Sequence, residues 1–107
     1  METQPLAIIY VPVPDVECAK TLARGVVGKH LAACANISGP IVSVYEWEGA
    51  VEEGPEWVLL LKTPPEKAAE LMAYLQEAHP YEVPCLLRLD GNANRVFADW
   101  AAGCCGS

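Results

Sequence analysis

The order of its apolar patterns is the feature that most constrains how this chain can fold. Strand-like runs occupy residues 6–11, 34–48, 57–62 and 83–90, and segments with apolar residues at helical spacing occupy 16–27 and 66–78. The order strand, helix, strand, strand, helix, strand is that of the ferredoxin-like split βαβ fold. We therefore predict an α+β domain with one antiparallel sheet, followed by a short last helix at 95–102.

Cap residues predict where the two main helices begin and end. Asp15 can accept backbone N–H bonds at the start of the first helix. Thr63 and Glu66 form a capping-box pattern at the start of the second helix, with Pro64 at the first helical position. Pro80 then requires the second helix to end just before it.

Turn and breaker residues divide the strands. Gly39-Pro40 indicates a bulge or an edge position within the second strand. The turn residues and acids at 49–55 predict the connection of an antiparallel hairpin, and 91–94 predicts a turn before the last helix. Gly103 is expected to close that helix, which leaves Cys104-Cys105 in an exposed and mobile tail.

Length, charge and cysteine usage narrow the class of protein. The 107 residues predict a single domain spanning 1–107, and the 52% apolar content favours burial of surface against a second copy. A net charge of -7 argues against binding to nucleic acid or to an anionic membrane surface. Five cysteines, an odd number, and no signal or membrane-length apolar segment lead us to expect a cytoplasmic protein with reduced thiols.

Several segments, taken together, carry a family resemblance. They are LAACANI at 31–37 with Gly39-Pro40, SVYEWEG at 43–49, LKT at 61–63, HPYEVP at 79–84, and Gly91-Asn92 with Trp100. Their order and spacing resemble the CutA family of divalent-cation tolerance proteins. The resemblance implies a homotrimer of ferredoxin-like subunits, assembled like PII signal-transduction proteins, with a role in tolerance to copper and other divalent cations.

The stretch HPYEVPC at 79–85 supplies the candidate metal ligands. His79 comes first, because imidazole suits copper and zinc and its position at a helix end is expected to leave the proton-free nitrogen accessible. The alternative is that His79 caps the last helical carbonyls. Glu82 and Cys85 are the next candidates. Residues three apart in an extended segment point to opposite faces, so the three side chains do not converge by spacing alone, and neighbouring subunits are an alternative source of ligands. Cys85 stands where the resemblance places a glutamate, and its thiol favours the softer copper or zinc.

A second set of residues lies, by the same resemblance, in or near a cleft between subunits: Tyr45, Trp47, Lys62, Tyr81 and Trp100. One interpretation is a pocket for a small anionic ligand, with Lys62 on its charge and the aromatic rings stacked against it. The other is that the aromatic residues fill the subunit interface and Lys62 pairs with Glu46, Glu48 or Glu82.

The remaining cysteines are expected to matter less. Cys34 is predicted to be a buried small hydrophobe, and Cys18 a passive residue near the start of the first helix. Cys104-Cys105 is interpreted as an auxiliary metal-binding tail.

The motifs of common enzymes and organic cofactors are missing from the sequence. It contains no Ser/His/Asp arrangement in a recognisable context, no phosphate loop and no dinucleotide fingerprint, so we expect a non-enzyme without an organic cofactor. The leading hypothesis is a homotrimer that binds copper or zinc. The alternatives are a PII-like signalling module with a small anionic ligand, and a ligand-free trimer that anchors an unknown protein partner.

Overall fold

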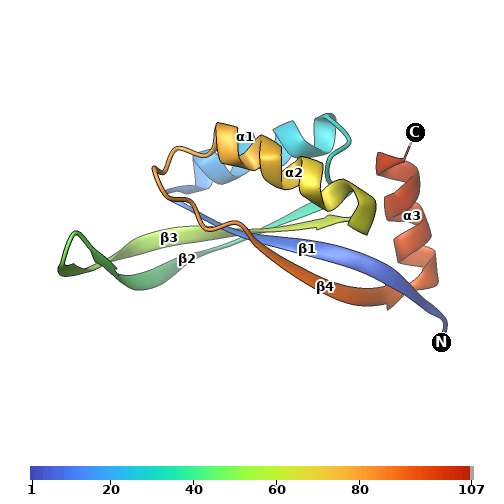
Figure 1. Ribbon diagram of the computed structural model, residues 1–107, viewed down its shortest axis with the longest axis horizontal. Coiled ribbons are helices and arrows are strands. Elements are labelled where there is room, and N and C mark those ends of the chain that lie inside the picture. Colours follow the sequence, from blue (N-terminus) through green and yellow to red (C-terminus); the bar gives the residue numbers. More distant parts are fainter. Residues whose placement is uncertain (107) are drawn as a thin grey trace.

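A four-stranded antiparallel sheet with the order β2-β3-β1-β4 forms the body of the molecule (Figure 1). The computed structural model describes residues 1–106. Its elements are β1 (Thr3–Val13), α1 (Val16–Gly28), β2 (Cys34–Trp47), β3 (Ala50–Thr63), α2 (Pro65–Ala78), β4 (Leu87–Asn94) and α3 (Arg95–Cys105). The predicted α+β, ferredoxin-like order and the short last helix are confirmed.

Helices α1 and α2 lie over the same face of the sheet, and the core fills the space between them and the strands (Figure 1). Alternate residues of β1 point into this core, because side chains of a strand alternate between its faces. The fully buried apolar side chains include Ala7, Ile9, Val11 and Val13 of β1, Leu59 and Leu61 of β3, Ala19 and Val26 of α1, and Ala68, Leu71 and Leu75 of α2. Among residues 1–106, no helix has the combination of length and apolar character needed to span a bilayer.

The helix boundaries confirm one predicted cap and correct the other. Asp15 accepts a 2.8 Å hydrogen bond from the backbone N–H of Cys18, as the sequence predicts. The predicted capping box at Thr63 is wrong: Thr63 ends β3, and its hydroxyl donates a 2.7 Å bond to the backbone carbonyl of Leu31. Because a buried carbonyl needs a hydrogen-bond donor, the Thr63 hydroxyl bonds to Leu31 and not to the start of α2. Pro64 occupies the N-cap position of that helix instead.

The β2–β3 hairpin is longer than predicted. Its strands continue through most of 49–55, and the chain reverses at Glu48-Gly49, where both residues have positive φ (51° and 83°), as a two-residue hairpin turn requires. Pairing with β1 stops at Trp57, so residues 41–56, called here the distal hairpin, extend beyond the rest of the sheet (Figure 1). The predicted bulge at Gly39-Pro40 and the edge position of β2 are confirmed.

The C-terminal region departs most from the sequence prediction. Strand β4 begins at Leu87 rather than at residue 83, and the predicted turn at 91–94 is part of this strand, because it pairs with the first residues of β1. Helix α3 runs through Gly103 to Cys105, which is fully buried with Leu6 and Ala33. The predicted mobile cysteine tail is therefore wrong. Burial also raises the pKa of the Cys105 thiol, which disfavours the thiolate that a metal would need.

Candidate functional site: an acidic cleft lined by aromatic residues

An open cleft of about 790 Å³ lies between the distal hairpin and the connection from α2 to β4. The hairpin supplies one wall and residues 80–85 supply the other. Its lining residues are Pro12, Ser43, Val44, Tyr45, Glu46, Trp47, Gly54, Pro55, Glu56, Pro80, Tyr81, Glu82, Val83 and Cys85. The cleft therefore brings together residues that lie up to about seventy positions apart in the sequence.

Tyr81 fixes the two walls relative to each other. Its hydroxyl donates a 2.7 Å hydrogen bond to the Glu56 carboxylate on β3. Burial raises the pKa of the Tyr81 phenol, and the hydrogen bond and negative charge of Glu56 raise it further. Tyr81 is therefore a neutral donor throughout the physiological pH range, and its hydrogen bond to Glu56 links the two walls of the cleft.

His79 lies behind this wall and not in it. The side chain is only 7% exposed, and its ring stacks at a tilt on Tyr81, with centroids 4.7 Å apart. Nε2 lies 2.8 Å from the carbonyl oxygen of Pro12, which can only accept, and Nδ1 receives the backbone N–H of Tyr81 at 3.0 Å. The partners assign the proton to Nε2 and leave neither nitrogen free for a metal. The prediction that this imidazole is accessible is wrong. The ring is buried, and its two hydrogen bonds hold the connection after α2 in place.

Glu82 and Cys85 do reach the cleft, and both are exposed. The structure therefore separates the expected ligands into one buried ring and two accessible groups. Within residues 1–106, no three side chains of histidine, cysteine, aspartate or glutamate gather closely enough to hold a metal ion. A single chain does not contain a preformed metal site in the part that the structure describes.

The charge of the cleft is entirely negative. Glu46, Glu56 and Glu82 line it, and of the residues that the structure describes, no lysine, arginine or histidine does. The sequence contains an indication of this negative charge that motif spacing does not reveal. No lysine or arginine occurs from residue 30 to 61, whereas five glutamates do. Glu46 and Glu56 are thus cleft residues that the search for ligand motifs missed. The arrangement suits a cation and disfavours an anion.

Comparison with known proteins agrees with the expected resemblance. The family model of the CutA1 divalent ion tolerance protein matches residues 7–104. The chain belongs to this family. It is 45% identical over 78 residues to a CutA homologue of Xenopus laevis, matching 73% of this chain and 52% of the frog protein. It is 37% identical over 94 residues to the divalent-cation tolerance protein CutA of Thermus thermophilus, matching 87% and 91% of the two chains.

Solved structures of the CutA family share the fold. A structure from Archaeoglobus fulgidus, described as a periplasmic divalent cation tolerance protein, matches with a TM-score of 0.88 and 34% identity, over 92% of this chain and 97% of the other. Relatives differ in length, however, and this chain spans about half of the curated frog protein.

The second set of residues expected from the CutA resemblance is divided by the structure. Tyr45, Trp47 and Tyr81 line the cleft, whereas Lys62 and Trp100 lie outside it. Lys62 Nζ is 5.5 Å from the centre of the Phe97 ring, and that ring lies 5.5 Å from Trp100. Within residues 1–106, Lys62 makes no ion pair, so the alternative pairing with Glu46, Glu48 or Glu82 is not formed inside one chain. It makes a cation–π contact at the α3 end of the sheet instead.

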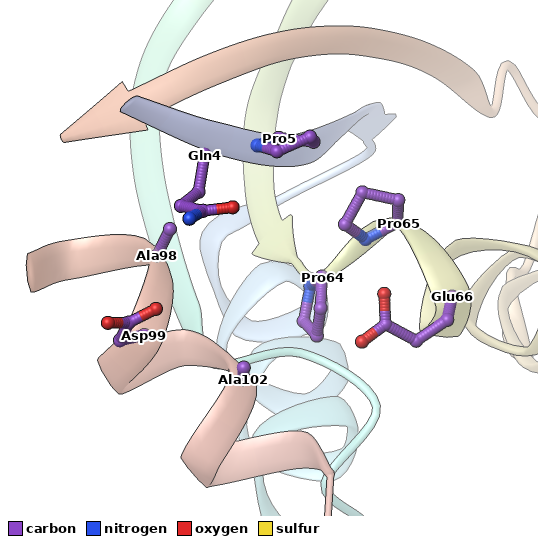
Figure 2. Close-up of a pocket in the computed structure, with 8 residues that line it drawn as sticks. All are labelled: Gln4, Pro5, Pro64, Pro65, Glu66, Ala98, Asp99 and Ala102. Atoms are coloured by element: carbon purple, nitrogen blue, oxygen red, sulfur yellow. The ribbon is translucent and has the colours of Figure 1, made fainter. Parts of the chain in front are cut away.

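A second pocket of this CutA family chain, about 390 Å³, lies between the start of β1, the start of α2 and α3 (Figure 2). None of the expected site residues lines it; the lining is Gln4, Pro5, Pro64, Pro65, Glu66, Ala98, Asp99 and Ala102. Figure 2 shows the carboxylates of Glu66 and Asp99 on opposite sides of the pocket. Asp99 is 3.5 Å from Arg95, which balances its charge. The larger cleft, which five of the eight expected residues line, is therefore the candidate site.

Proposed function

We propose that this CutA family protein binds divalent metal ions, copper or zinc, at the acidic cleft and contributes to metal tolerance as a homotrimer. One observation carries the proposal: three carboxylates and the Cys85 thiol line a single cleft without a basic side chain among the described residues. The names of the relatives, which refer to divalent-cation tolerance, agree with a cation as the ligand.

The donor set favours soft divalent ions. A thiolate at Cys85 suits copper and zinc better than magnesium or calcium, and Glu82 adds a carboxylate oxygen. Binding would release the thiol proton, so affinity falls as the pH is lowered. His79 takes a positioning role in this proposal, because its two ring nitrogens are occupied by Pro12 and Tyr81.

Ligands from a second copy complete the site in this proposal, and the distal hairpin supports such an assembly. Val42, Val44 and Val51 of the hairpin are 73%, 62% and 76% exposed, and Tyr45 and Trp47 are also exposed. A two-stranded ribbon with large apolar side chains in water on both faces is marginal by itself. The number of copies, three, comes from the family resemblance.

Zinc titration tests the ligand assignment, since zinc does not oxidise thiols. We expect the purified protein to bind Zn²⁺ by calorimetry, with affinity reduced at least about tenfold in Cys85→Ser and in Glu82→Gln. Cys104→Ser on α3 and Glu77→Gln on α2 are the matched controls and should bind like the parent. Unchanged binding by the Cys85→Ser, Glu82→Gln double variant would refute the assignment.

The assembly has a separate test. Light scattering at micromolar concentration should give three times the chain mass of 11.5 kDa. A monomer mass would contradict the trimer. A trimer that binds neither metals nor small ligands would instead favour the ligand-free anchoring protein.

We propose a reducing compartment, the cytoplasm, for this chain. All five of its cysteines are free, including Cys18, which packs against the core, and Cys34, which is only half buried rather than fully buried as expected. Fractionation of cells that express the protein tests this, and recovery with periplasmic proteins, as the description of the Archaeoglobus relative suggests, would contradict it.

A further inference from the structure

A single chain leaves the proposed metal site incomplete. Glu82 and Cys85 both reach the cleft, but among residues 1–106 no three metal-ligating side chains gather closely enough to hold an ion. His79 adds no ligand, because both of its ring nitrogens are already bonded. Zinc in proteins takes four ligands at structural sites, and three protein ligands with a water at catalytic sites. One chain therefore offers fewer ligands than a zinc ion normally takes.

The distal hairpin is both a wall of this cleft and the part of the chain that favours contact with a second copy. Val42 and Val51 of the hairpin are largely exposed, and Tyr45 and Trp47, which line the cleft, are half-exposed. Apolar side chains of this size in water favour burial against a partner. A copy that covers the hairpin lies at the edge of the cleft, where it can supply the missing ligands.

Negative charge on the hairpin opposes the same contact. The hairpin contains no lysine or arginine and five glutamates, which are Glu46, Glu48, Glu52, Glu53 and Glu56. Among residues 1–106, none of these carboxylates forms an ion pair. Copies that meet through their hairpins bring these charges closer together, and each whole chain has a net charge of -7. The apolar side chains therefore favour association, and the glutamates disfavour it.

A divalent ion in the cleft would change both the ligand set and the charge balance. Its positive charge offsets the repulsion between carboxylates where copies meet, and its coordination is completed by ligands that one copy does not supply alone. Each effect is stronger in the assembly than in a single chain. An ion that binds the assembly more tightly than the single chain must strengthen association by the same factor, because the two equilibria are linked.

We infer that the divalent ion is shared between copies, so that metal binding and the association of copies are coupled in this protein. The inference rests on the proposed metal site and adds to it the control of assembly by the ion. Zinc should tighten the contact between copies, and dilution into single chains should release zinc. The expected coupling is at least about fivefold in each direction.

Subunit exchange measures the effect of zinc on association. Two preparations of the full chain with different fluorescent labels are mixed, and energy transfer between the labels reports the exchange of copies. Saturating zinc should slow this exchange by about fivefold or more. Magnesium and sodium chloride at the same ionic strength are the controls, because they screen charge but do not favour a thiol ligand. An equal effect of zinc and magnesium, or no effect of bound zinc, would overturn the inference.

Matched variants separate the ion from the contact. Cys85→Ser with Glu82→Gln should associate like the parent without metal and lose the effect of zinc on exchange. Val51→Asn, an exposed hairpin residue that does not line the cleft, should weaken association and, in dilute protein, lower zinc affinity by at least about fivefold. Ala73→Asn, exposed on α2, should change neither. Zinc affinity that stays constant when the parent and Val51→Asn are diluted into single chains would overturn the inference.

Failure of the coupling and failure of the proposed function give different results. Zinc that binds single chains and the assembly with the same affinity would overturn the coupling and leave the metal site in place. Absence of zinc binding to the concentrated assembly would overturn the metal site, and the coupling with it.

Discussion

Strand β3 has two halves in opposite environments, although they are continuous in sequence. Residues 57–63 pair with β1 on one side and β2 on the other, and Leu59 and Leu61 are fully buried under the helices. Residues 50–56 pair only with β2, and Val51 is largely exposed. Residues 57–63 are stabilised by contacts within one chain. Residues 50–56 carry apolar side chains that nothing in that chain covers.

This difference separates folding from assembly. Substitutions in the buried half should change the stability of the chain at any protein concentration. Substitutions in the distal hairpin should change association and the cleft, and their effects should depend on concentration. The following predictions test that division, from the largest expected effect to the smallest.

Leu61→Ala should reduce the free energy of unfolding by about 2–5 kcal/mol, because it leaves a cavity in the core. Val51→Ala on the same strand is the matched control. In dilute protein it should change stability by no more than about 0.5 kcal/mol. Urea unfolding at two protein concentrations measures both, and an equal loss for the two variants in dilute protein would contradict the comparison.

Val44→Glu should weaken association at least about tenfold, because a partner would have to bury an unpaired charge on the hairpin. Light scattering over a concentration series measures the change, and circular dichroism should show the fold intact. Ala73→Glu, exposed on α2, serves as the control. Association of Val44→Glu equal to that of the parent would show that this face of the hairpin is not an interface.

Thr63→Val should cost about 1–3 kcal/mol, because it removes the donor to the buried Leu31 carbonyl while keeping the side-chain shape. The loss should be the same at all protein concentrations, since Thr63 lies in the buried half of β3. Thr21→Val, exposed on α1, is the control and should change little. Chemical denaturation gives both values, and a loss in Thr63→Val no larger than in Thr21→Val would contradict the assigned role.

In an alkaline absorbance titration, Tyr81 should give a last ionisation step above the ordinary tyrosine range, because its pKa is raised by burial and by Glu56. The sign of the stability effect follows from that direction. The folded-state pKa lies above the unfolded value of about 10, so the contribution of Tyr81 is complete below about pH 10 and is lost as the pH rises further.

Tyr81→Phe should remove the last ionisation step, and Tyr74→Phe, on α2, should leave it in place. The expected change in the absorbance titration is small, and it is confined to alkaline pH. A last step that survives in Tyr81→Phe would show that the hydrogen bond between the two walls of the cleft does not hold in solution.

Local patterns in the sequence predicted much of the fold. The continuous apolar run at residues 6–11 predicted a buried strand, and Ile9 and Val11 of β1 are fully buried. Helical spacing and Asp15 fixed the start of α1, and Pro80 fixed the end of α2. These features succeed because the period and the cap are set by residues within a few positions of each other.

Contacts between distant residues decided the candidate site. The partner of His79 Nε2 is Pro12, 67 positions away, and the partner of Tyr81 is Glu56, 25 positions away. No local spacing reports such pairs, so the sequence could name His79 as a ligand but could not show that its ring is already bonded. The same holds for Lys62, which its strand position alone could not place over Phe97.

The sequence by itself determined the order of elements, the buried faces of β1, α1 and α2, and the acidic character of the distal hairpin. These properties follow from the periodicity of apolar residues and from the charges in the sequence. Both can be read without knowing which strands pair. The tertiary structure decided the length of the hairpin, the register of β4, the burial of Cys105 and the separation of His79 from Glu82 and Cys85. Each of these depends on which distant segment satisfies a backbone group or covers an apolar side chain.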